Sequence, residues 1–283
     1  MNKVVIVSDS TCDLSPELVK EYGIKIIPLT VAFGEELYHD GVDITTEQLY
    51  QKVSEKNELP HTAALTPGQL LAFFEEIIEE GNDILFAGIG SSLSKSYENA
   101  CMIASEFPEG RIEIVDSKNL STGTGLLIIK ACMLRDTGKN IHEIAEELRK
   151  IVPNVRSQFI VDTMEYLHKG GRCSGVAKLF GTLLKIHPLI AVKEGVLKVA
   201  GKPRGKMTVG LNQMLDMLKA EGNNVDEDII FVTHSIAPES AKYLLPLVKE
   251  AYPNARVVET NAGAIISSHC GKGTIGIIYA LKH

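Results

Sequence analysis

Hydrophobic and polar positions in the first half of the chain alternate in blocks typical of strands followed by helices. The apolar run at residues 4–7 stops at Ser8, which predicts a strand buried on both faces, as in a parallel sheet. Ser15 and Pro16 then provide an N-cap and a first-turn proline for a helix. Gly23 stands where that helix would end.

The same alternation continues to about residue 153. Further strands are predicted at 24–33, 83–89 and 111–115, and further helices begin near Thr45, Thr66, Ser94, Ser117 and Asn140. Strands that alternate with helices favour parallel pairing. We therefore expect residues 1–153 to form an N-terminal α/β domain around an open, mostly parallel sheet.

The pattern changes beyond Pro153. Strands are predicted at 158–161, 187–192, 196–200, 228–232, 255–259 and 274–280, with helical segments at 163–168, 178–185, 207–220 and 238–250. Gly195 and the residues before it form a hairpin signal between two of these strands. We expect residues 154–283 to form a C-terminal α+β domain with a mixed or antiparallel sheet.

Composition narrows the class of protein. The 283 residues are 45% hydrophobic but only 6% aromatic, with no tryptophan, so the core must be mostly aliphatic. A formal net charge of −7 argues against a nucleic-acid-binding surface. The five cysteines are odd in number and lack metal-ligand spacing, which indicates reduced thiols and no metal. No signal peptide or membrane span is apparent, so we expect a soluble cytoplasmic protein.

One glycine-rich motif resembles a dinucleotide-binding fingerprint. Residues 271–276 match G-x-G-x-x-G, but the dinucleotide-binding fingerprint requires a following helix. Residues 277–280 are instead typical of a strand, which argues against a dinucleotide cofactor. The chain also has no phosphate-binding G-x-x-x-x-G-K-[ST] motif and no G-x-S-x-G nucleophile elbow.

Four polar residues are candidates for a binding site. Ser91 lies in a strand-to-helix turn, where hydroxyl and helix-start N–H groups suit an anion. Arg172 follows two glycines, and its guanidinium group can bind a carboxylate through two parallel hydrogen bonds. Thr62 lies in a polar loop, and His269 precedes a glycine-rich turn. Each also has an ordinary structural interpretation, as a cap, a turn residue, a solvated arginine or a satisfied histidine.

Six segments in fixed order carry a family resemblance. They are SDSTCDL at 8–14, DGVDI at 40–44, IGSSLSKSY at 89–97, DS at 116–117, VDTMEYLHKGGR at 161–172 and SHCGKG at 268–273. Each is weak alone, but their shared order and spacing through nearly the whole chain is specific. Together they resemble the DegV family of bacterial fatty-acid-binding proteins.

The resemblance implies a lipid tunnel between the two domains and a long-chain fatty acid, such as palmitate, as the ligand. It implies that Thr62 and Ser91 hold the carboxylate, with Arg172 and His269 as supporting polar residues. It further implies a carrier rather than an enzyme. A separate fatty acid kinase subunit would supply ATP and form the acyl phosphate, and transient membrane contact is compatible with this role.

Apolar residues near these motifs are candidates for the tunnel wall, although ordinary core packing is the alternative for each. They are Ile89, Leu93, Leu179, Phe180, Leu183, Ile186, Ile190 and Ile266. The chain departs from the family where Ala63 and Ala64 replace a serine and a glutamine, which puts their head-group contacts in question. Lys95, in place of a glycine, either adds positive charge at the head group or points to water.

A different class of function uses two of the same residues. A serine-dependent acyl hydrolase would need the Ser91 hydroxyl hydrogen-bonded to His269, and an acid to orient the histidine. Asp9 or Asp116, at the ends of two predicted strands, could be that acid. We favour the carrier because the chain has no nucleophile elbow.

Overall fold

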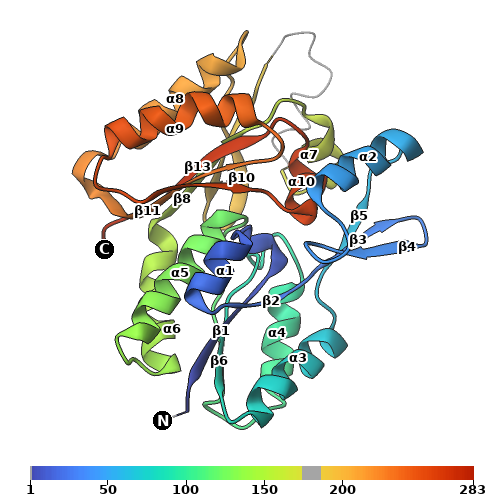
Figure 1. Ribbon diagram of the computed structural model, residues 1–283, viewed down its shortest axis with the longest axis vertical. Helices are drawn as coiled ribbons and strands as arrows, with labels where there is room; N and C mark the ends of the chain where they lie inside the picture. The colour runs from blue at the N-terminus through green and yellow to red at the C-terminus, as the bar shows by residue number, and fades with distance from the viewer. Residues whose placement is uncertain (1, 174–185) are drawn as a thin grey trace.

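The computed structural model describes residues 2–173 and 186–283 of the chain. The helix predicted at 178–185 lies outside the described residues. Two sheets stacked one above the other in Figure 1 organise the molecule, and a smaller third sheet projects to one side.

The first sheet is parallel and four-stranded. Its strands, in spatial order, are β2 (Lys25–Ile27), β1 (Val4–Asp9), β6 (Asp83–Phe86) and β7 (Ile112–Ile114). Helices cover both faces: α1 (Pro16–Tyr22), α5 (Thr122–Asp136) and α6 (Ile141–Ile151) on one, α3 (Pro67–Glu79) and α4 (Ser96–Ala104) on the other. Every residue of β1 is buried, as expected for an apolar run between two helical layers.

The strand predicted at 24–33 is in fact two strands. Pro28 separates β2 from β3 (Thr30–Phe33), because a proline has no main-chain N–H to continue a ladder. Beyond it, β3 pairs with β4 (Glu36–His39) and β5 (His61–Ala63) in a small antiparallel sheet. With α2 (Thr46–Lys56), this sheet forms the arm at the right of Figure 1.

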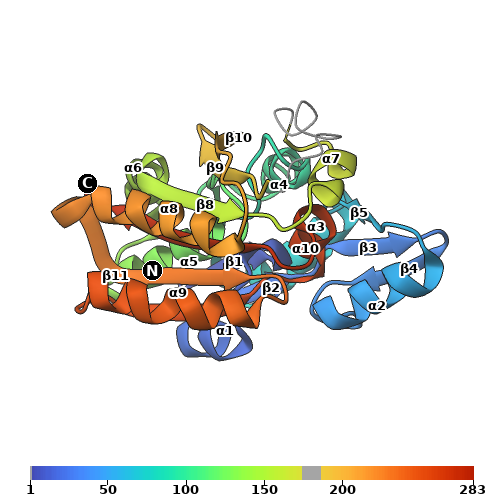
Figure 2. The same ribbon diagram turned by 90° about the horizontal axis from the view of Figure 1, so that it is seen from above.

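The second sheet is six-stranded and mixed. Its strands, in order, are β10 (Val196–Gly201), β9 (Leu189–Lys193), β8 (Val155–Ile160), β13 (Ile275–Leu281), β11 (Val225–His234) and β12 (Val257–Asn261). Only β11 and β12 are parallel. Helices α8 (Met207–Ala220) and α9 (Pro238–Ala251) cover one face, while α7 (Glu165–Gly170) and α10 (Ala264–Cys270) lie at one end (Figure 1 and Figure 2). The predicted α/β class, with one parallel and one mixed sheet, is confirmed.

The hairpin between β9 and β10 forms as predicted. Glu194 and Gly195 both have positive φ, at 54° and 82°. Two such residues make the tight turn that matches the twist of adjacent strands. The motif at 271–276 lies between α10 and β13, so a strand follows it rather than a helix. This order confirms that the dinucleotide fingerprint is absent there.

Helix α5 joins the two halves of the molecule. Eleven consecutive residues, from Thr122 to Cys132, are buried, so the helix is enclosed on every side. One hydrophobic cluster combines Ile6 of β1 and Leu126 of α5 with Phe231 and Ile278 of the second sheet. The two sheets therefore share a core through this helix.

A buried ion pair crosses the same boundary. The ammonium group of Lys130 on α5 lies 2.6 Å from carboxylate oxygens of both Asp226 and Asp228 on β11. The Lys130 side chain is only 10% exposed. Within residues 2–173 and 186–283, no helix is both long and apolar enough to cross a membrane.

Candidate functional site

A largely apolar cavity of about 170 Å³ lies between the first sheet, the arm and helices α7 and α10. Aliphatic and aromatic side chains form most of its wall: Leu29, Ile89, Leu93, Leu120, Phe159, Leu167, Leu197, Ile265 and Ile266. The polar side chains on it are those of Thr62, Ser94, Lys95, Arg172 and His269. A cavity of about 40 Å³ shares Leu120, Phe159, Ile266 and Cys270 as walls, so the apolar space continues inward.

Two elements bring Thr62 and His269 together. Thr62 lies on β5, opposite Val31 of β3. His269 lies on the last turn of α10. The Thr62 Oγ1 and His269 Nε2 atoms are 2.9 Å apart, within hydrogen-bond distance.

The first turn of α10 is held from a distant part of the chain. Asp13 accepts a hydrogen bond of 2.8 Å from the Gly263 N–H, and Asp40 accepts one of 2.7 Å from the Ala264 N–H. Both carboxyls are buried, and burial raises the pKa of Asp40 to about 6. These two acids fix the start of the helix that positions His269.

His269 is neutral at physiological pH. Burial first, and then the nearby Arg172 guanidinium, lower the pKa of the imidazole to about 4. Its Nδ1 atom is buried without a hydrogen-bond partner. Gly170 packs against that atom so closely that a Cβ at residue 170 would lie 2.6 Å away. The site therefore requires glycine there, and Nε2 is the only ring nitrogen with a partner.

The structure does not bring Ser91 to this cavity. The Ser91 hydroxyl donates a 2.6 Å hydrogen bond to Asp116 Oδ2, and its main-chain N–H donates one of 3.0 Å to Oδ1. Ser94, three residues later in the same turn, lines the cavity instead. Both serines were visible in the sequence, but only the path of the turn decides which one faces the apolar space.

Three of the eight candidate wall residues line the cavity: Ile89, Leu93 and Ile266. Ile190 is fully buried in the cluster packed beside it, and Ile186 forms an isolated bridge with Arg204. Leu179, Phe180 and Leu183 lie outside the described residues. Ala63 and Ala64 are both at the cavity, as is Lys95, whose ammonium group also contacts Glu98 at 2.8 Å.

The contacts that a serine hydrolase requires are not formed. Ser91 is bonded to Asp116 and His269 to Thr62, so the two proposed catalytic residues are not partners. Asp9 accepts hydrogen bonds from Thr11 and from the Ile89 N–H, and no acid in the described residues orients His269 Nδ1. The geometry thus offers an anion a set of neutral and cationic donors rather than a nucleophile and its base.

The depressed pKa of His269 predicts a pH-dependent stability. As pH falls from about 6.5 to about 4, His269 becomes protonated in the unfolded chain but stays largely neutral in the folded protein. The free energy of unfolding therefore falls by about 3 kcal/mol. Buried Asp40 contributes in the opposite direction, because the pKa of its carboxyl is raised. The difference in unfolding free energy between the native protein and His269→Gln isolates the histidine. Denaturant titrations at pH 7 and pH 4 should show this difference change by about 3 kcal/mol. An unchanged difference would contradict the assignment.

Comparisons with known proteins agree along the whole chain. The model of the DegV family, "Uncharacterised protein, DegV family", matches residues 3–282. A DegV domain-containing protein of Clostridium acetobutylicum is 30% identical over 285 residues, covering all of both chains.

Solved structures of DegV family proteins are also similar to this chain. A fatty-acid-binding DegV family protein from Thermus thermophilus has 29% identity and a TM-score of 0.91, covering 99% of this chain and 100% of that one. DegV of Bacillus subtilis, a fatty acid binding protein, has 27% identity and a TM-score of 0.86, with all of both chains covered. A stearic-acid-binding protein from Eubacterium ventriosum has 27% identity and a TM-score of 0.87, over 99% and 98% of the two chains. The chain described here belongs to the DegV family.

Proposed function

We propose that this protein binds a long-chain fatty acid, such as palmitate, in the cavity between β5, α7 and α10. The observation that carries the proposal is an apolar cavity with hydroxyl, imidazole and guanidinium groups on its wall. Similarity to proteins from Thermus thermophilus and Bacillus subtilis that bind fatty acids supports it.

The carboxylate would lie at Thr62, Ser94 and Arg172. When the neutral His269 donates its Nε2–H to Thr62 Oγ1, the threonine hydrogen is free to donate to the ligand. Arg172 is exposed and adds the positive charge that a partly buried carboxylate needs in a chain of net charge −7. In this arrangement His269 positions Thr62 and does not itself touch the carboxylate.

The hydrocarbon chain supplies the binding energy. At about 0.8 kcal/mol per buried CH₂, a chain of roughly 16 carbons has on the order of 12 kcal/mol of gross transfer free energy. The loss of ligand freedom and the ordering of the site reduce that figure considerably. The polar groups then fix which end of the ligand lies where.

The position of the charged residues suggests how the ligand is used. Arg172 and Lys95 are both exposed, so the carboxylate would lie at the open end of the cavity. A carboxylate held there is accessible to a second protein. We therefore propose that a cytoplasmic fatty acid kinase subunit supplies ATP and converts the presented carboxylate to an acyl phosphate. Transient contact with a membrane would load the carrier.

The test is direct ligand binding. Protein purified from bacterial cells should carry a long-chain fatty acid, identified by native mass spectrometry. After the lipid is removed, titration with palmitate should show saturable binding at one molecule per chain. A lipid-free protein that takes up no palmitate would refute the proposal, whatever kinase is present.

A further inference from the structure

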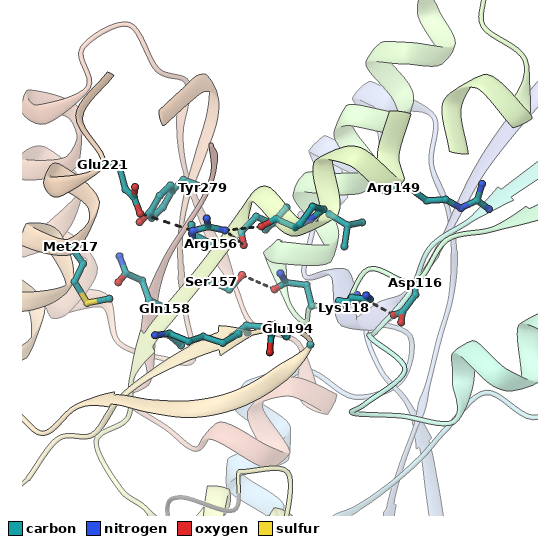
Figure 3. Close-up of a pocket in the computed structure, with 18 of the residues that line it drawn as sticks. Asp116, Lys118, Arg149, Arg156, Ser157, Gln158, Glu194, Met217, Glu221 and Tyr279 are labelled. Atoms are coloured by element: carbon teal, nitrogen blue, oxygen red, sulfur yellow. Dashed lines mark hydrogen bonds and ion pairs between the residues drawn. The ribbon is translucent and has the colours of Figure 1, made fainter. Parts of the chain in front are cut away.

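A second, larger cavity of about 930 Å³ lies where strands β8 and β9 separate. The two strands pair only from Gln158–Ala191 to Ile160–Leu189, although β8 begins at Val155 and β9 continues to Lys193. Beyond the last pair they form an open fork (Figure 3). Among the described residues, no side chain lines both this cavity and the one proposed for the fatty acid.

The walls of the fork present unpaired main-chain groups. Neighbouring residues of a strand point their N–H and C=O groups to opposite edges. The Val161 N–H donates to the Pro188 carbonyl on the β9 side. The main-chain N–H and C=O groups of Phe159 and Ser157 therefore also point to that side. Ser157 has no partner on β9, because the ladder ends at Gln158. Its hydroxyl is already bonded to Asn119, at 2.6 Å.

A buried side chain at this cavity also lacks a partner. Gln158 is only 2% exposed, and its Nε2 group donates to the Met214 carbonyl at 3.0 Å. Its Oε1 atom is buried without a hydrogen bond. A buried amide oxygen left unpaired is costly, so a turn of this amide toward the cavity, where an N–H or O–H donor of a ligand would reach the oxygen, is favoured.

Charged groups without partners lie on the other walls. Lys118 and Lys193 line the cavity, and no ion pair of the described residues involves either ammonium group. Glu194 is likewise without an ion pair. The remaining charges are engaged: Arg149 with Glu113, Arg156 with Glu221, and Asp116 with Ser91.

We propose that this cavity binds a nucleoside phosphate. A nucleobase N–H would donate to Gln158 Oε1, with the base against Met217 and Val155. The ribose hydroxyls would donate to Glu194, as carboxylates receive them in other nucleotide sites. The phosphate would lie between Lys118 and Lys193.

The size and place of the cavity support this class of ligand. Small-molecule sites usually have volumes of roughly 300–1,000 Å³ and occur where domains meet. The walls here come from η2 (Val152–Asn154) and β8, from the β9–β10 hairpin, from α8 and from the loop after β7. A ligand would therefore contact both sheets.

Calorimetric titration of the full, palmitate-loaded chain with AMP, GMP, CMP and UMP tests the proposal. At least one should bind saturably, and its nucleoside without phosphate should bind about tenfold more weakly. Lys118→Met and, separately, Gln158→Met should each weaken binding about tenfold. Lys219→Met removes an exposed lysine of α8 outside the cavity and should change nothing.

Three outcomes would overturn the proposal. The first is no saturable binding by any of the four nucleotides up to about 1 mM. The second is displacement of palmitate, which would place the nucleotide in the other cavity. The third is binding that Lys118→Met leaves unchanged, a variant whose exposed side chain should not affect folding. Because palmitate binding is measured separately, failure here leaves the carrier proposal untouched.

Discussion

Removing two hydroxyl groups, with Thr62→Val and Ser94→Ala in one chain, should weaken palmitate binding by about 100-fold or more. A hydrogen bond to a charged group contributes about 1.5–3 kcal/mol, and two are lost. Valine has nearly the shape of threonine, so the apolar wall stays filled. The measurement is the dissociation constant of palmitate for the delipidated proteins.

The serine that the sequence favoured supplies the matched control. Ser91→Ala removes a hydroxyl from the same turn, but one that donates to Asp116 and not to the cavity. Its affinity for palmitate should stay within about twofold of the native value. If Ser91→Ala weakens binding and Ser94→Ala does not, the head-group site proposed here is wrong and Ser91 is the ligand residue.

Loss of the ion pair on α5 should have the largest effect on stability. Lys130→Ala leaves Asp226 and Asp228 facing a buried position without a cation, and it should lower the free energy of unfolding by about 3 kcal/mol. This loss of stability is at the low end of the range for broken buried ion pairs, because the Asp228 side chain is 50% exposed. Urea titration at pH 7 measures the change.

An exposed pair provides the comparison. Lys150 contacts Glu147 at 2.8 Å one helical turn away, and its side chain is 61% exposed. Lys150→Ala should leave the free energy of unfolding nearly unchanged, because water and salt screen an exposed ion pair. Equal losses for the two variants would show that burial adds nothing to the Lys130 interaction.

Elements with local signals were predictable from the sequence. The caps at Ser15 and Thr66 begin α1 and α3 where the residues indicate, and the apolar run of β1 is buried as expected. Signals of this kind depend on a few neighbouring residues. They survive in the folded chain because the tertiary structure agrees with them.

Elements held by distant residues were not predictable. Helix α10 has only seven residues, and carboxylates at Asp13 and Asp40, more than 200 positions earlier, hold its first turn. A helix this short is unstable alone. The second cavity was not predictable for a related reason. It exists because β8 and β9 stop pairing, and no residue pattern in either strand indicates where the pairing ends.

The choice between Ser91 and Ser94 shows the same limit within a single turn. Both hydroxyls lie close to the start of α4, and the resemblance pointed to the first of them. Asp116, just after β7, accepts both hydrogen bonds of Ser91, whereas Ser94, whose hydroxyl accepts a hydrogen bond from the Ser96 N–H, lies at the apolar space. Contacts between strand ends thus decide which hydroxyl lies at the cavity, and those contacts cannot be read from the linear sequence.

The shared core around α5 changes what the boundary near residue 153 means. Each large sheet draws its strands from one side of that boundary, yet Leu126 and Phe231 belong to one hydrophobic cluster. Cutting the chain there would expose the buried face of α5 on one fragment and its partner strands on the other. We therefore expect residues 1–153 and 154–283 to unfold together, so that heating melts both sheets in one cooperative transition.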